Sequence, residues 1–165
     1  MIDKLPRRAV LIILLLSVET MACSFAPGYQ LFRFSETELI GTGEAPYAPA
    51  ITVGSIKRGF DDGNPASCSD AGILTLVVEG YDPGDRTGFL FRLDAGSLGG
   101  TEFQDEILAP IELEKGVFGF RIVWLDWVKG QRTQTQISAT LGVRAVSDTG
   151  VESEEVLVQV EHAGS

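Results

Sequence analysis

The sequence predicts an all-β sandwich that follows a cleaved N-terminal export signal. Beyond residue 50, several stretches alternate apolar and polar residues, as strands with one buried face do. Turn sequences rich in glycine, proline and aspartate separate these stretches, and sustained helical periodicity is lacking. About six or seven strands, spaced by roughly 10 to 20 residues, are typical of two packed sheets.

Length and charge limit what this protein can be. A chain of 165 residues holds one domain of ordinary size and a leader. Removing residues 1–22 takes away three of 13 basic and two of 23 acidic residues, which leaves 10 against 21, a net charge of −11. So acidic a surface repels the phosphates of nucleic acid and the anionic headgroups of membranes. The densest basic spot, Lys57-Arg58, is too small to reverse this, so we expect no nucleic-acid partner.

Residues 1–22 have the order of a secretion signal. Lys4, Arg7 and Arg8 precede the apolar run 9–16, and small residues follow it. A core of about ten residues is half of the ~20 that a permanent membrane helix needs. The run is apolar on every face, which excludes an amphipathic helix at the surface of a core. We therefore expect an extracytoplasmic protein, periplasmic or associated with the cell envelope.

The end of the leader can be interpreted in two ways. Ala22-Cys23 resembles the lipobox of bacterial lipoproteins, which implies lipidation of Cys23 and attachment to the membrane through that anchor. Ordinary cleavage near Ala22 would instead leave Cys23 able to form a disulfide bond with Cys68. That bridge would close a loop of about 45 residues, worth about 4 kcal/mol in the chain-entropy model. The even number of cysteines favours the bridge.

Residues 23–50 lack periodicity and carry repeated glycine and proline, so we expect an extended tether there, followed by a domain over residues 51–162. Residues 105–114 fit either a short helix or a strand. A turn at 147–150 leads into Val156, Val158 and Val160 and predicts a closing hairpin. The predicted buried faces consist of Leu74, Leu76 and Val78, then Phe89, Phe91 and Leu93, then Phe118, Phe120, Ile122 and Trp124, and finally Ile137, Ala139, Leu141, Val143 and Ala145.

Two parts of the domain resemble a known family. Pro46 and Pro49 ahead of residues 51–53, together with residues 141–153 before a valine-rich last strand, are similar to the opening and the closing hairpin of a fibronectin type III or related immunoglobulin-like domain. The resemblance implies a sandwich of that topology. The chain departs from the family at Leu141, where the penultimate strand usually carries a tyrosine.

An unusual loop at residues 57–72 separates the first two strands. Asp61, Asp62, Asn64 and Asp70 offer hard oxygen ligands there, and glycine allows a sharp turn, so calcium is a candidate ligand. The alternative is a turn stabilised by side-chain hydrogen bonds and pinned at Cys68. Loops at the ends of sandwiches are also where recognition often occurs.

Catalytic signals are weak. His162 is the only histidine and lies close to the C-terminus, and the many acidic residues make any chosen carboxylate pair uninformative. Trp124 and Trp127 would point to opposite faces of a strand, so one of them, Trp127, is a candidate contact surface. We expect a non-enzymatic binding or structural module at the cell envelope with a protein or glycan partner. The alternative is a secreted hydrolase that depends on carboxylates or calcium in the 57–72 loop.

Overall fold

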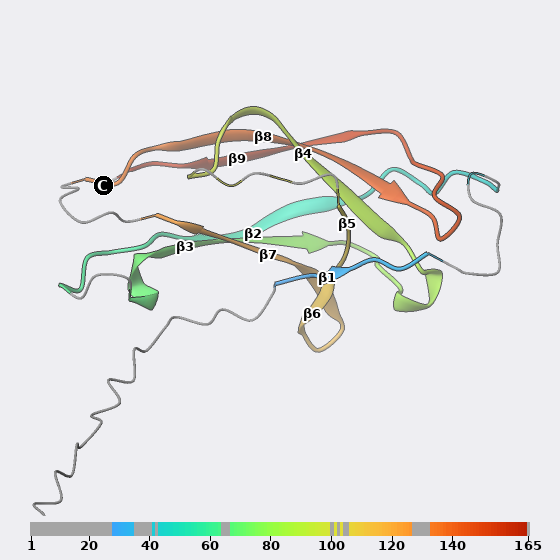
Figure 1. Cartoon of the computed structure of the whole chain (residues 1–165), viewed down its shortest axis with the longest axis horizontal. Helices are drawn as coiled ribbons and strands as arrows, with labels where there is room; N and C mark the ends of the chain where they lie inside the picture. Colours follow the sequence, from blue (N-terminus) through green and yellow to red (C-terminus); the bar gives the residue numbers. More distant parts are fainter. Residues whose placement is uncertain are drawn as a thin grey trace, which may run out of the picture.

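The protein is a β-sandwich, as the sequence predicts. The structure, a computed structural model, describes residues 28–34, 41, 43–63, 67–99, 101, 103, 106–126 and 133–164. These residues form two antiparallel sheets that lie face to face (Figure 1). None of the described helices is long and apolar enough to span a membrane.

One sheet has four strands and the other has five. The four-stranded sheet has the order β2-β3-β7-β6, and the five-stranded sheet has the order β1-β5-β4-β8-β9. Short 3-10 helices, η1 (Cys68–Asp70) and η2 (Pro83–Asp85), precede β3 and β4. In chain order the strands are β1 (Gln30–Leu31), β2 (Ile51–Lys57), β3 (Ala71–Val78), β4 (Gly88–Ser97), β5 (Ile107–Ala109), β6 (Ile111–Glu114), β7 (Val117–Leu125), β8 (Ile137–Val146) and β9 (Val156–His162).

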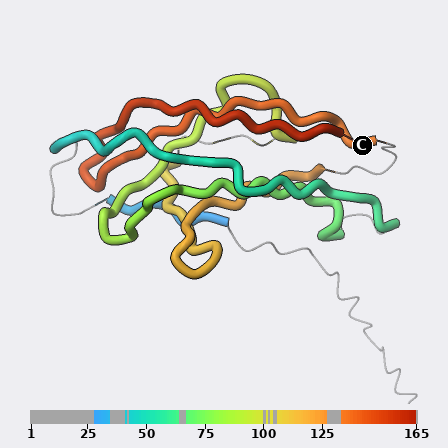
Figure 2. The backbone as a smooth tube through the Cα atoms, turned by 180° about the vertical axis from the view of Figure 1, so that it is seen from behind, coloured from blue at the N-terminus to red at the C-terminus, as the bar shows by residue number. Residues whose placement is uncertain are grey.

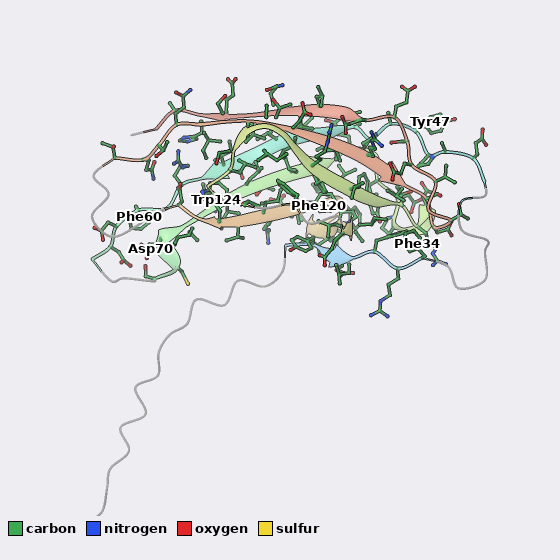
Figure 3. The ribbon with its side chains drawn as sticks, turned by 45° about the horizontal axis from the view of Figure 1, so that its top comes forward. Phe34, Tyr47, Phe60, Asp70, Phe120 and Trp124 are labelled. Carbon is green, nitrogen blue, oxygen red and sulfur yellow. The ribbon has the colours of Figure 1, made fainter. Side chains whose placement is uncertain are left out.

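The predicted buried faces meet between the two sheets. Successive side chains of a strand point to opposite faces, so every second residue enters the core. Three phenylalanine rings form the centre of this core. The centroid of the Phe120 ring lies 4.8 Å from that of Phe91 and 5.5 Å from that of Phe89, and both pairs pack edge to face. Phe120 lies between the layers in Figure 3. The alternation seen in the sequence is confirmed in β3, β4, β7 and β8.

The described part of 105–114 forms two strands and no helix. Strand β5 pairs with β4 in the five-stranded sheet, whereas β6 pairs with β7 in the other. Pro110 stands between them. Because proline has no N–H to donate to a ladder, it suits the point where the chain leaves one sheet for the other.

Part of the predicted tether belongs to the sandwich. Strand β1 pairs with β5, Gly28 bridges to Arg121 of β7, and the Phe32 amide donates to the Ile107 carbonyl at 2.9 Å. Figure 2 shows this segment, in blue, along the sandwich. The expectation of an unpaired tether is therefore wrong for residues 28–32. The leader and Cys23 lie outside the described residues and stay predictions.

The predicted closing hairpin is confirmed. Strands β8 and β9 pair from Ile137↔His162 to Val143↔Val156. The turn begins at Ser147, whose carbonyl accepts from the Gly150 amide at 3.0 Å. Buried Ser153 then accepts from the Ala145 amide at 2.9 Å, which holds the longer connection against the end of β8.

Candidate functional site

The loop between β2 and β3 contains the predicted metal ligands. The Asp61 carboxylate accepts from the Gly63 amide at 2.8 Å, and the Asp62 carboxylate accepts from the Ser67 hydroxyl at 2.9 Å. Asn64 lies outside the described residues. No group of three or more acidic, histidine or cysteine side chains in the described part of the chain is placed to hold a metal ion. The calcium site stays a prediction, and the contacts favour the alternative of a hydrogen-bonded turn.

Asp70 stabilises the start of η1. Its carboxylate accepts from the Ser67 amide at 3.2 Å while the Ser67 hydroxyl accepts from the Ser69 amide at 3.2 Å, the reciprocal arrangement of a capping box. Asp70 is buried, and the backbone around it continues the network, since the Asp126 amide donates to the Asp70 carbonyl at 3.0 Å. Asp70 and Phe60 lie together at this end of the molecule in Figure 3.

Replacing Asp70 by alanine should therefore lower the free energy of unfolding by about 1 kcal/mol, the usual cost of losing a cap. Denaturant unfolding of both proteins, with and without millimolar calcium, measures this. A capping function predicts the same loss in both conditions. If calcium raises the stability of the wild type and the Asp70→Ala variant loses that gain, the metal site is right and capping alone is wrong.

A buried ion pair ties this loop to the end of β7. Arg58 follows β2 and Asp126 follows β7, and their side chains are 7% and 5% exposed. The guanidinium donates to the carboxylate twice, from Nε to Oδ2 at 2.7 Å and from Nη2 to Oδ1 at 2.8 Å. The Gly59 amide adds a third hydrogen bond to Oδ2 at 2.6 Å. This planar two-bond geometry is the strongest form of an arginine–carboxylate contact.

The same guanidinium joins the C-terminal part of the chain to the loop. Arg58 Nη2 donates to the Thr135 carbonyl at 2.8 Å, and Nη1 lies 3.5 Å from His162 Nδ1. Gln134 donates to the Gly59 carbonyl. His162, considered above as a catalytic base, is therefore a neighbour of the Arg58 guanidinium at the end of β9.

The surroundings of Asp126 act on its pKa in opposite directions. Burial raises the pKa, because it penalises the charged carboxylate. The hydrogen bonds from Arg58 and from the Gly59 amide lower it, and the net pKa lies below the usual 3.8. Asp126 is thus ionised at neutral pH and has the function of an anchor.

The remaining predicted site residues are only partly described. Trp124 is 5% exposed and lies in the core. Trp127, the candidate contact residue, lies outside the described residues. Cys68 begins η1, whereas Cys23 lies outside the described residues, so the bridge and the lipid anchor both stay predictions.

On the outer face of the five-stranded sheet, Arg92 of β4 and Arg144 of β8 are paired with carboxylates. Arg144 contacts Glu152 at 2.8 Å and Glu155 at 3.6 Å, and Arg92 contacts Glu155 at 2.9 Å. Gly142 makes room for this network, because a methyl group there would come within 2.8 Å of the Glu155 carboxylate. Both arginines are therefore satisfied by neighbouring carboxylates of the same chain.

The outer face of the four-stranded sheet is different. A hollow of about 700 Å³ lies over β2, β3, β6 and β7. Gly119 of β7 lies beside it: a methyl group there would collide with the Leu76 carbonyl and come within 2.7 Å of Leu113 Cδ1, so Leu113 lies closely over that glycine. Aliphatic and cationic side chains dominate the lining, chiefly Ile73, Val77, Val117 and Val123 with Lys57 and Arg121.

The two cations of this hollow differ from those of the opposite face. Lys57 and Arg121 are exposed, and neither forms an ion pair within the described part of the chain. In a chain with 23 acidic and 13 basic residues, an unpaired cation on an apolar surface is unexpected. We call this surface, lined by the residues just named and Leu113, the β3 face.

Comparison with models of protein families, with curated proteins and with solved structures finds no match.

Sequence reasoning missed both the ion pair and the β3 face. Arg58 and Asp126 are 68 residues apart, and no local pattern links them. The β3 face left a signal, because Ile73, Val77 and Val123 are apolar although alternation assigns them to the solvent side. Those positions would have pointed to an exposed apolar surface.

Proposed function

We propose that this protein is an exported, non-enzymatic binding module of the cell envelope, and that it binds through the β3 face. The observation that carries this is the difference between the two outer faces. Over β4 and β8, one face carries arginines that are paired with carboxylates, whereas over β3 and β7 the other face is hollowed, lined largely by aliphatic side chains, and carries two cations without an ion-pair partner among the described residues. Exposed apolar surface with a polar rim marks interaction sites on soluble proteins.

The other parts of the proposal have separate support. The order of charge and apolarity in residues 1–22 supports export. The local hydrogen bonds of Asp61, Asp62 and Asp70 support a structural over a catalytic function of the loop.

We also propose an immunoglobulin-like topology. The facing sets β2-β3-β7-β6 and β4-β8-β9 support it, with β1 and β5 as additional strands beside β4. In a count that omits these two, the first, second, fifth and fourth strands form one sheet and the remaining three form the other, as in immunoglobulin-like domains.

Site-specific photo-crosslinking tests the proposed function. A photoreactive amino acid replaces Val117 on the β3 face, where the side chain is 37% exposed, and the full chain is produced in its native host and irradiated in intact cells. We expect a crosslinked adduct in an extracytoplasmic fraction. Intact-mass analysis of the uncrosslinked protein should show that residues 1–22 have been removed.

Leu157 gives the matched control, because it is an exposed aliphatic residue, 53% accessible, on the opposite sheet. Adducts at position 117 that are missing at position 157 support binding through the β3 face. Equal adducts at both positions would overturn it, and an uncleaved chain in the cytoplasm would overturn export.

A further inference from the structure

The β3 face is polarised along its strands. Across the sheet, Lys57 pairs with Ile73, and two residues further along β3, on the same face, Thr75 pairs with Arg121. Both cations therefore lie toward one end of the hollow. With strands about 4.8 Å apart and about 3.3 Å between residues, the Cα atoms of Lys57 and Arg121 are about 12 Å apart, on either side of β3.

The opposite end of the hollow carries aliphatic side chains and one carboxylate. From Arg121 the surface continues along β7 past Gly119, with Leu113 over it, to Val117. This distance is about 13 Å, at four residues of a strand. Glu114 lies beside Val117 and is the one carboxylate among the lining residues, all of which are described. A ligand with its anion at the Arg121 end and an apolar tail toward Val117 would match this order.

The position of the hollow on a sheet face narrows the class of ligand. The backbone groups of β3 are already used in the ladders with β2 and β7, so an extended peptide lying on this face would find no backbone partners. An alkyl chain needs none. The hollow is lined by aliphatic rather than aromatic side chains, which makes it unlike a stacking platform for sugars. Its volume, about 700 Å³, lies within the range of small-molecule sites.

We infer that the β3 face binds a single-chain amphiphile with an anionic headgroup, such as a fatty acid, with the headgroup between Lys57 and Arg121 and the chain over Val77 and Val117. This inference rests on the proposed function. The ligand is the free, monomeric amphiphile, because the net charge of −11 that remains without residues 1–22 keeps the protein away from an anionic bilayer.

Methyl NMR on the purified mature protein tests this with two probes that share a tail. Decanoate and decyltrimethylammonium are titrated below their micellar concentrations. We expect decanoate to shift the methyl signals of Val77 and Val117 saturably, with an affinity about tenfold above that of the cationic probe. Equal affinities, or shifts centred on Leu157, would overturn the inference.

Charge reversal provides the matched variants. Lys57→Glu and Arg121→Glu should each weaken decanoate binding by about fivefold, whereas Lys115→Glu, in the exposed turn between β6 and β7, should leave it unchanged. An equal loss in Lys115→Glu would mean that only net charge matters and would overturn the site. Binding to anionic vesicles that matches binding to decanoate would overturn the monomeric ligand.

The two proposals fail separately. Crosslinks at position 117 without decanoate binding would leave the binding face in place and overturn the ligand class. Decanoate binding without specific crosslinks in cells would support the chemistry of the hollow and overturn the proposed function.

Discussion

Replacing Asp126 by alanine should lower the free energy of unfolding by about 3–5 kcal/mol, because it leaves the Arg58 guanidinium buried without its counter-charge. The same change removes the acceptor of the Gly59 amide. Since a domain of this size is stable by about 5–15 kcal/mol, this is a large fraction of the total. Denaturant unfolding followed by tryptophan fluorescence measures the loss.

The exposed pair Arg144–Glu152 gives the matched control. Both side chains are 43% exposed, so Glu152→Ala should cost at most about 1 kcal/mol. In a double-mutant cycle, adding Arg58→Ala to Asp126→Ala should cost little more, because the uncompensated charge is gone. If the double variant instead lost as much stability as the two single variants added together, the side chains would act independently and the ion pair would not be the anchor.

The lowered pKa of Asp126 determines the pH below which the Arg58–Asp126 ion pair no longer stabilises the folded protein. A carboxyl whose pKa is lower in the folded state stabilises the fold above its unfolded pKa, about 3.9, and loses that effect as the pH falls through its folded pKa. Wild-type stability should therefore decline below about pH 4 more steeply than that of Asp126→Asn. Parallel curves for the two proteins would contradict this.

Local alternation was enough to predict most strands and their buried faces. In β8, for example, alternate residues from Ile137 to Ala145 are apolar, and each of those side chains is at most 4% exposed. This succeeds because strand geometry converts a spacing of two residues directly into a face. The same rule treated the other side of β3 and β7 as solvent-facing, so the β3 face was overlooked.

Features that depend on distant pairing were not predictable. Strand β1 consists of Gln30 and Leu31, which carry no periodicity of their own, and it exists because β5 offers a free edge. The pair Arg58–Asp126 forms because β2 and β7 flank β3 and both finish at the same end of the sheet. The loop acids were visible in the sequence, but only the fold shows that Asp70 bonds backwards to Ser67.

The anchor and the β3 face are connected through the same strands. Lys57 is the last residue of β2, and the next residue, Arg58, enters the buried ion pair. Arg58 therefore fixes where the strand ends, and with it the position of Lys57 relative to Ile73. In the Asp126→Ala variant, Lys57 should therefore be held less firmly beside Ile73, even under conditions in which the protein remains folded.

Replacing Phe120 by alanine should be as damaging as loss of the ion pair, for a different reason. The ring is fully buried and contacts Phe89 and Phe91 from the opposite sheet, so its removal leaves a cavity at the centre of the sandwich. Phenylalanine-to-alanine changes in such positions cost about 3–5 kcal/mol, as the transfer and cavity contributions add. Denaturant unfolding should show the loss as a lower midpoint with an unchanged slope.

Phe60 is the matched control, because it is the same residue type at 61% exposure in the loop near Asp70. Phe60→Ala should change stability by no more than about 0.5 kcal/mol. Phe120→Leu should cost less than Phe120→Ala, since leucine refills part of the space between the sheets. If Phe120→Ala were no worse than Phe60→Ala, Phe120 could not lie between the sheets. The facing of β7 against β4, on which the outward position of Arg121 and the β3 face depend, would then be wrong.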